Sequence, residues 1–400
     1  MRNPFSHVTI AALNITEVAM LFLSKKVFIF LAVCLLCLTH VAQASLIPTA
    51  PKINAKSYML IDYHSGHILT EKNQTDRVEP ASLTKLMTAY VVMHEIQDGG
   101  IKMEDEVTIS EKAWRMKGSR MFIEVNSKVS VKELMLGMII QSGNDASVAL
   151  AEHTAGSEDS FATLMNKHAI RLGMTGSHFV NSTGWPHEEH YTTAADLAIL
   201  TRAMIKEFPE HYALYKIKKF TYNNIPQFNR NRLLWVDERV DGVKTGHTDS
   251  AGYCLISSAL KNEMRLIAVV LGTKSERARE TASRSLLNYG FRFFETFKLH
   301  AANAPLTDMR VWKGDKELVS LGLTNSLYIT TPRGKRNKIK ANMNVDATIV
   351  APITKGQEYG KVEVRLGDEV IAERPLVALD DVAEGGLWTR TVDNIKLLFQ

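Results

Sequence analysis

The spacing of apolar residues changes twice along this 400-residue chain, and these changes constrain its fold more than any other feature. Between about residues 80 and 208, apolar side chains recur at the three- and four-residue intervals of amphipathic helices. From Gly242 they form longer runs typical of buried strands, and after Ala301 short strands alternate with frequent turns. The pattern predicts an α/β (α+β) domain in which helices flank a sheet, followed by a small all-β domain.

Capping signals mark the predicted helices. Pro80 suits a first helical position, and Ser130 with Glu133 forms a capping box before the next apolar helix. Thr192 or Thr193 is the expected cap of a later helix. The helices are predicted at about residues 80–98, 131–140, 145–156, 193–208 and 275–299.

Strand patterns lie on either side of this helical stretch. Residues 58–73 alternate around a His-Ser-Gly turn and predict a β-hairpin. The segments VKTGHT, GYCLISSAL and MRLIAVVLG predict three strands, the last two forming a hairpin that is buried on both faces.

An apolar segment near the N-terminus predicts secretion. Residues 27–38 carry no charge, Lys25 and Lys26 precede them, and Ala42-Gln43-Ala44 follows. This is the pattern of a signal peptide that is cleaved after Ala44. A membrane-spanning anchor is the alternative, but twelve helical residues rise only about 18 Å and the hydrocarbon core is about 30 Å thick. Met20 would begin a signal peptide of ordinary length, so we hypothesise that translation starts there.

We therefore expect four segments: a signal peptide (1–44), a large domain (45–298), a small β domain (299–383) and a C-terminal helix (384–400). Cleavage would remove Cys34 and Cys37 and leave Cys254 as the one thiol of the mature chain, so no intramolecular disulfide is expected. The net charge of +5 is spread without a long basic block, which argues against a nucleic-acid partner. No repeated C-x-x-C spacing suggests a zinc site.

The last residues, LWTRTVDNIKLLFQ, form an amphipathic pattern after Gly385-Gly386. We expect this helix to lie in a membrane surface through its apolar side, since it is too short to span a bilayer. The alternative is a helix packed on the β domain. The apolar side comprises Trp388, Val392, Ile395, Leu398 and Phe399, and the opposite side Arg390, Asp393, Asn394 and Lys396.

Ser82-Leu83-Thr84-Lys85 is the first candidate site. Residues three apart share a helical face, so the lysine amine can reach the serine hydroxyl and, if its pKa is depressed, take its proton. The S-x-x-K pattern is weak alone, because Ser258-Ala-Leu-Lys261 repeats it at a strand end. We interpret that second copy as coincidental.

Two more motifs carry candidate groups. Ser142-Gly143-Asn144 lies between two predicted helices, where it could line a cleft or merely cap a helix. Lys244-Thr245-Gly246 lies on a predicted strand; its glycine would let a substrate backbone approach, although a protective lysine on a sheet edge is the alternative.

The three motifs occur in the order S-x-x-K, S-x-N, K-T-G, which is that of penicillin-binding proteins and class A β-lactamases. With segments such as EPASLTKLMTAY, QSGNDASVAL and DGVKTGHTDSAGY, the chain resembles the low-molecular-mass penicillin-binding proteins of the penicillin-binding protein 5 and 6 type, which are D-alanyl-D-alanine carboxypeptidases. The resemblance implies a β-lactamase/transpeptidase-like fold with an antiparallel sheet.

It also implies roles for individual residues. Ser82 would be the nucleophile and Lys85 its base, Ser142 a proton-shuttling serine, and Asn144 an amide that orients Lys85 and the peptide. Substrate would lie along the K-T-G strand, with Lys244 also helping to keep Lys85 neutral. The substrate-binding residues would be Lys244, Thr245, His247, Arg230 and Arg279, with Asp196 as a supporting acid. Backbone N–H groups of Ser82 and His247 would form the oxyanion hole.

The implied activity is release of D-alanine from peptidoglycan pentapeptides ending in D-Ala-D-Ala, with β-lactams as inhibitors and without metal or cofactor. The implied location is the periplasmic face of the inner membrane. The alternatives on the same residues are a D,D-endopeptidase and a β-lactamase, although no E-x-x-L-N stretch lies between Asn144 and Lys244. An inactive wall-binding scaffold would require a broken motif, and all three motifs are intact.

Overall fold

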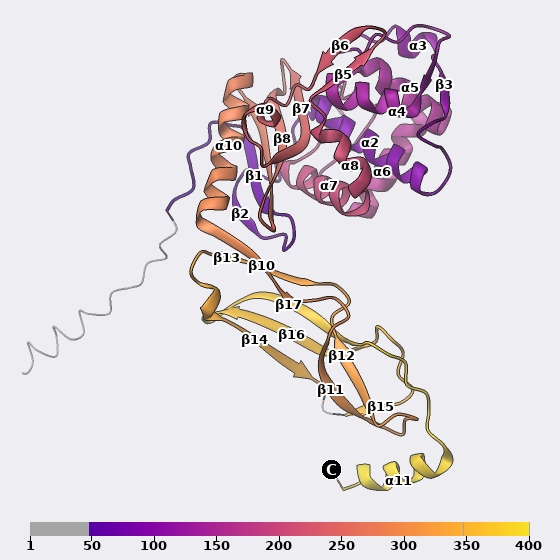
Figure 1. Cartoon of the computed structure of the whole chain (residues 1–400), viewed down its shortest axis with the longest axis vertical. Coiled ribbons are helices and arrows are strands. Elements are labelled where there is room, and N and C mark those ends of the chain that lie inside the picture. The colour runs from indigo at the N-terminus through magenta and orange to yellow at the C-terminus, as the bar shows by residue number, and fades with distance from the viewer. Residues whose placement is uncertain (1–47, 347, 400) are drawn as a thin grey trace, which may run out of the picture. The chain divides into compact units, whose positions relative to one another are not determined.

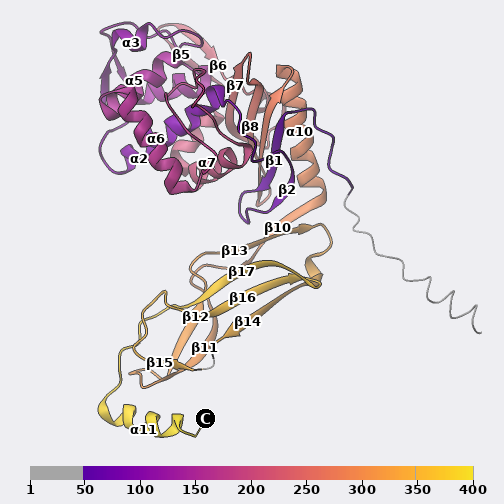
Figure 2. The same cartoon turned by 180° about the vertical axis from the view of Figure 1, so that it is seen from behind.

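The computed structural model of the protein describes residues 48–346 and 348–399 (Figures 1 and 2). The predicted signal peptide, with Cys34, Cys37 and its cleavage site, lies outside the described residues. Cys254 is buried and forms no disulfide with another described residue.

A five-stranded antiparallel sheet forms the centre of the first domain, in the order β2-β1-β9-β8-β7. It confirms the predicted hairpin and the three predicted strands. The strands are β1 (Ser57–Asp62), β2 (Ile68–Lys72), β7 (Val240–Thr248), β8 (Gly252–Lys261) and β9 (Met264–Thr273).

Helices cover both faces of this sheet, as Figures 1 and 2 show. On one face α10 (Glu276–Phe293) contacts β8 and β9, and Gly290 gives room to Leu266. On the other face Ile267 and Val269 join a large apolar core shared with the remaining helices. These are η1 (Ala81–Leu83), α2 (Thr84–Gln97), α3 (Glu111–Trp114), α4 (Val131–Leu136), η2 (Gly137–Gln141), α5 (Asn144–Ala155), α6 (Glu158–Leu172), α7 (Ala194–Glu207), α8 (Pro209–Tyr212) and η3 (Ala213–Lys216). The short α9 (Leu233–Val236) contacts β7.

The predicted caps are present, and two helices deviate from ideal geometry beside the candidate motifs. Thr193 caps α7, and Ser130 with Glu133 forms both bonds of the capping box at α4. The helix predicted after Pro80 begins as the short 3₁₀ turn η1, while α4 widens into the π-helical turn η2. Such irregular turns are frequent at functional sites.

The predicted helix over residues 275–299 is wrong at its end, because α10 stops at Phe293 and β10 (Phe294–His300) follows directly. β10 pairs with β13 (Leu327–Pro332), with Phe294 opposite Pro332 and Phe297 opposite Ile329. The pairing gives the segment a sheet partner that helical periodicity cannot reveal.

The second domain has a six-stranded sheet in the order β14-β16-β17-β12-β11-β15, which bears out the predicted β domain. Its apolar core includes Leu321, Val362 and Leu376. The strands are β11 (Pro305–Trp312), β12 (Leu318–Gly322), β14 (Ile339–Val345), β15 (Ile349–Val350), β16 (Glu358–Leu366) and β17 (Glu369–Ala378), with a short η4 (Arg336–Lys338). Two-stranded sheets elsewhere pair β3 (Glu106–Thr108) with β4 (Lys128–Ser130) and β5 (Lys219–Tyr222) with β6 (Ile225–Phe228).

The C-terminal helix α11 (Leu387–Leu397) confirms the predicted helix but corrects the position of Asp393. This residue, expected on the exposed polar side, is 7% exposed; its carboxylate accepts a hydrogen bond from the backbone N–H of Lys313 at 2.7 Å. Trp388, Leu398 and Phe399 are more than 80% exposed. The helix is therefore attached through its polar side. In the described part of the chain, no helix is long and apolar enough to cross a membrane.

Candidate active site

The S-x-x-K motif lies where η1 passes into α2. Ser82 is half-buried in η1, and Lys85 follows in the first turn of α2 with only 1% of its surface exposed. The Nζ atom of Lys85 lies 3.0 Å from Oγ of Ser82. The three-residue spacing thus places the amine against the hydroxyl, as helical geometry predicts.

Two acceptors far away in the sequence hold the amine in place. Nζ of Lys85 donates to Oδ1 of Asn144 at 2.7 Å and to the backbone carbonyl of Thr183 at 2.6 Å. With the Ser82 hydroxyl, these contacts account for all three donors of an ammonium group. The S-x-N motif and the S-x-x-K motif therefore meet at one atom.

The surroundings of Lys85 lower its basicity. Burial, and after it the guanidinium of Arg230, lowers the pKa of Lys85 from 10.5 to about 7, while the carboxylates of Asp145 and Glu158 oppose the shift. A large fraction of this amine is therefore neutral near pH 7, which an ordinary surface lysine would not be. A neutral amine can take a proton from a neighbouring hydroxyl.

Ser142 and Lys244 form a second amine–hydroxyl pair. Ser142 ends the π-helical turn η2 in the left-handed region, at φ 65°, and Nζ of the buried Lys244 donates to its Oγ at 2.9 Å. Burial, followed by the charges of Lys85, Arg230 and Arg279, lowers the pKa of Lys244 well below its usual value. A non-glycine residue at positive φ is uncommon, and such strain is found preferentially at functional sites.

The K-T-G strand packs directly against η1. A Cβ atom at Gly246 would come within 3.1 Å of the Pro80 carbonyl oxygen and 3.2 Å of Leu83. The glycine expected to admit a substrate backbone therefore also admits η1. Arg279, which is buried, donates from Nη1 to the Gly246 carbonyl at 3.2 Å and thus supports the strand.

A cavity of about 400 Å³ opens in front of Ser82. His247 borders it and packs its ring on Tyr253, with centroids 4.0 Å apart. Thr245, on the same strand, is 6% exposed. The cavity is also lined by Gly118, Ser119, Asn144, Thr183, Gly184, Trp185, Pro186, Thr248, Asp249 and Ser250.

Arg230 and Asp196 occupy different surroundings. Arg230 is exposed and, among the described residues, has no hydrogen bond or ion pair; it acts on Lys85 and Lys244 through its charge. Asp196 accepts hydrogen bonds from Gly176 N at 2.9 Å and Ser177 Oγ at 2.6 Å. Arg230 therefore influences the site through its positive charge, without a hydrogen bond to it. Asp196 holds the loop that contains Gly176 and Ser177.

Sequence reasoning missed the loop that follows α6. Besides the Thr183 carbonyl, it supplies Gly184, where a Cβ atom would lie 1.8 Å from the carbonyl oxygen of Ala81. The side chain of Asn181 accepts hydrogen bonds from the backbone N–H groups of Thr183, Gly184 and Trp185. The turn-forming sequence Asn-Ser-Thr-Gly was the available signal.

The second S-x-x-K copy shows no comparable geometry. Ser258 accepts a hydrogen bond from Arg265 at 2.6 Å, and Lys261 is exposed at the end of β8. Within residues 48–346 and 348–399, no group of three His, Cys, Asp or Glu side chains could hold a metal ion.

Two family models match the chain. The model described as D-alanyl-D-alanine carboxypeptidase matches residues 44–275, and the model of the C-terminal domain of penicillin-binding protein 5 matches residues 294–384. The residues between the two matches are those of α10.

Curated relatives and solved structures agree with these matches. D-alanyl-D-alanine carboxypeptidase DacC of Escherichia coli is 44% identical over 358 residues, which are 88% of this chain and 90% of that protein. DacA of the same organism is 42% identical over 363 residues, 89% of this chain and 90% of that protein. The crystal structure of penicillin-binding protein 5 from Haemophilus influenzae has a TM-score of 0.81 and 44% identity, and the match covers 84% of this chain and 100% of that chain.

Proposed function

Because the chain belongs to the D-alanyl-D-alanine carboxypeptidase family, we propose that it is a serine-type carboxypeptidase that removes the terminal D-alanine from peptidoglycan peptides ending in D-Ala-D-Ala. One observation carries the mechanism: the Nζ atom of Lys85 lies 3.0 Å from Oγ of Ser82 and has a pKa lowered to about 7. The amine is close enough, and neutral often enough, to act as general base.

Acylation begins when neutral Lys85 takes the proton of Ser82. The oxygen of Ser82 attacks the carbonyl of the penultimate D-alanine, and the backbone N–H groups of Ser82 and His247 stabilise the oxyanion. The bond to the terminal D-alanine breaks, and its nitrogen receives a proton through Ser142, which accepts a hydrogen bond from Lys244. The product is an ester on Ser82.

Deacylation reverses the roles of the same groups. Water attacks the ester, its proton passes to a neutral amine of the site, and Ser82 recovers its hydroxyl proton as the carboxylate leaves. The substrate carboxylate is proposed to be attracted by Lys244 and Thr245 on β7 and by the exposed charge of Arg230.

A β-lactam presents a comparable carbonyl and would acylate Ser82 in the same way. Efficient β-lactamases of class A release the product with a glutamate and a bound water. Among the described residues, Nζ of Lys85 forms hydrogen bonds with Ser82, Asn144 and the Thr183 carbonyl, and none of these groups is a carboxylate. This favours a penicillin-sensitive carboxypeptidase over a β-lactamase.

We further propose that the chain is secreted through its N-terminal signal and rests on the outer surface of the inner membrane. The exposed apolar side chains of α11 support the second part, because an amphipathic helix presenting Trp, Leu and Phe suits a membrane interface. Attachment through Asp393 leaves those side chains free.

Fluorescent penicillin labelling tests the proposed activity. Wild type is expected to acquire a covalent label and to release D-alanine from a D-Ala-D-Ala pentapeptide, whereas Ser82→Ala does neither. Ser258→Ala, which alters the second S-x-x-K copy, is the matched control and should label like wild type. An unlabelled wild type, or a labelled Ser82→Ala variant, would refute the proposal.

A further inference from the structure

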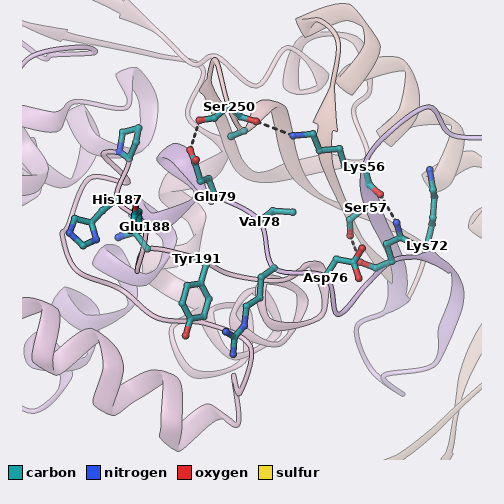
Figure 3. A pocket seen from close by; sticks show the side chains of 15 residues that line it. Lys56, Ser57, Lys72, Asp76, Val78, Glu79, His187, Glu188, Tyr191 and Ser250 are labelled. Carbon is teal, nitrogen blue, oxygen red and sulfur yellow. Dashed lines mark hydrogen bonds between the residues drawn. The ribbon is translucent and has the colours of Figure 1, made fainter.

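A second, larger cavity adjoins the one in front of Ser82. It has a volume of about 1120 Å³ and lies between the β1–β2 hairpin, the chain leading into η1 and the loop that contains Pro186 (Figure 3). Pro186 and Ser250 line both cavities. A ligand held at Ser82 can therefore continue into this space.

Three cations border the larger cavity. Nζ of Lys56 donates to the Ser250 carbonyl at 3.0 Å, Nζ of Lys72 donates to the Ala55 carbonyl at 2.9 Å, and the guanidinium of Arg77 lies 4.3 Å from the centre of the Tyr191 ring. All three cations are exposed, and in the described part of the chain none forms an ion pair. Each of these three side chains is therefore free to form an ion pair with a carboxylate of a ligand.

The acidic side chains of the lining are Asp76, Glu79 and Glu188. Glu79 already accepts hydrogen bonds from the hydroxyls of Ser250 and Thr248, as Figure 3 shows for Ser250. The cavity therefore offers both signs of charge. Such a lining suits a segment that carries carboxylates together with an amine, rather than a neutral or purely acidic ligand.

We propose that this cavity binds the charged part of the peptide that precedes D-Ala-D-Ala, with a carboxylate of that segment lying among Lys56, Lys72 and Arg77. The inference rests on the proposed carboxypeptidase function and extends it, because it assigns selectivity for charged wall peptides to residues outside the motifs. Peptides without upstream charge would use the first cavity alone.

Two substrates distinguish binding in the larger cavity from binding in front of Ser82. Diacetyl-L-Lys-D-Ala-D-Ala carries no charge before the scissile bond, whereas L-Ala-γ-D-Glu-L-Lys-D-Ala-D-Ala carries a carboxylate and free amines. The test variant is Lys72→Glu/Arg77→Glu. The matched control is Lys132→Glu/Lys340→Glu, which makes the same charge change at exposed residues that line neither cavity.

We expect kcat/KM of the test variant for the charged pentapeptide to fall about 3- to 10-fold, as expected for losing exposed ion pairs. Its kcat/KM for the uncharged tripeptide and its penicillin acylation rate should stay at wild-type values. The control variant should match wild type on both substrates.

An unchanged ratio of the two kcat/KM values in the test variant would overturn the inference while leaving the carboxypeptidase proposal intact. The same is true of an equal loss on both substrates. Failure of the proposed function itself has a different signature, because wild type would then neither cleave the uncharged tripeptide nor react with penicillin. That result would overturn both.

Discussion

The active-site cleft and the C-terminal helix depart from the usual distribution of side chains in opposite directions. In the cleft, the amines of Lys85 and Lys244 are buried, whereas on α11 and directly after it the side chains of Trp388, Leu398 and Phe399 lie in solvent. Buried amines lose hydration, and exposed apolar clusters favour association. In the cleft, burial lowers the pKa values of Lys85 and Lys244. On the C-terminal helix, exposure leaves the apolar side chains free to contact another surface.

The largest expected effect comes from replacing the buried amine by a group that stays protonated. Lys85→Arg keeps the positive charge but removes the neutral form, because the pKa of arginine stays above the working pH range. We expect the penicillin acylation rate to fall about 10²- to 10⁴-fold, the usual contribution of a general base. Stopped-flow acylation measures it.

Folding of this variant must be checked, since Lys85 has 1% exposure and the guanidinium is larger. A wild-type melting temperature together with lost acylation supports the base assignment. Lys132→Arg, at an exposed lysine outside the site, is the control and should acylate normally. Normal acylation by Lys85→Arg would show that another group takes the proton of Ser82.

The second effect concerns the exposed apolar side of α11. Trp388→Glu/Leu398→Glu should weaken binding to phospholipid vesicles about 10²- to 10⁴-fold, because it removes two large apolar side chains and each contributes about 1.5–3 kcal/mol when it leaves water. Penicillin acylation should not change. Vesicle sedimentation provides the measurement.

The matched variant is Thr389→Glu/Asn394→Glu, which adds two carboxylates at exposed positions of α11 outside its apolar side. It should retain most of the vesicle binding. Equal losses in the two variants would mean that charge repulsion, not apolar contact, governs attachment.

A smaller effect is expected from the cation that acts on the cleft from outside. Arg230 lowers the pKa of Lys85, so Arg230→Gln should raise it. If Lys85 is the proposed base, it must be neutral to accept a proton, and acylation should rise with pH through this pKa. The acid limb of the profile should therefore move to higher pH.

The acylation rate of Arg230→Gln should therefore be lower than that of wild type at pH 6, where less of Lys85 is neutral. Near pH 9 the two rates should differ least. The position of the limb separates this effect from weaker binding, which lowers the whole profile. Arg232→Gln, at another exposed arginine, is the control. A limb that stays in place or moves to lower pH would exclude the electrostatic role.

The comparison also explains what the sequence could and could not predict. Ser82 and Lys85 lie three residues apart on one helical segment, so their contact follows from local geometry. The third partner of Lys85 is the backbone carbonyl of Thr183, 98 residues away. Every residue has a backbone carbonyl, and no side-chain pattern indicates which carbonyl of a distant loop will lie next to Lys85.

Periodicity failed for similar reasons at two other places. The segment FETFKLH is compatible with a helix or a strand, and its pairing with β13 decides the outcome. A helical projection assigned Asp393 to the solvent-exposed side of α11, because the projection contains no information about the β domain. In both cases the deciding partner lies far along the chain.

The smallest expected effect concerns the carboxylate of Asp393. It tests whether this group determines that the apolar side of α11 faces outward. Asp393→Ala leaves the backbone N–H of Lys313 without its acceptor, which costs roughly 1–3 kcal/mol when the donor remains buried. We expect the Lys313 amide to exchange its hydrogen about 5- to 100-fold faster, with unchanged acylation. Asp393→Asn keeps an acceptor oxygen and should exchange more slowly than the alanine variant. If the alanine variant exchanged at the wild-type rate, α11 would be held by contacts other than its buried carboxylate, and its orientation would need another cause.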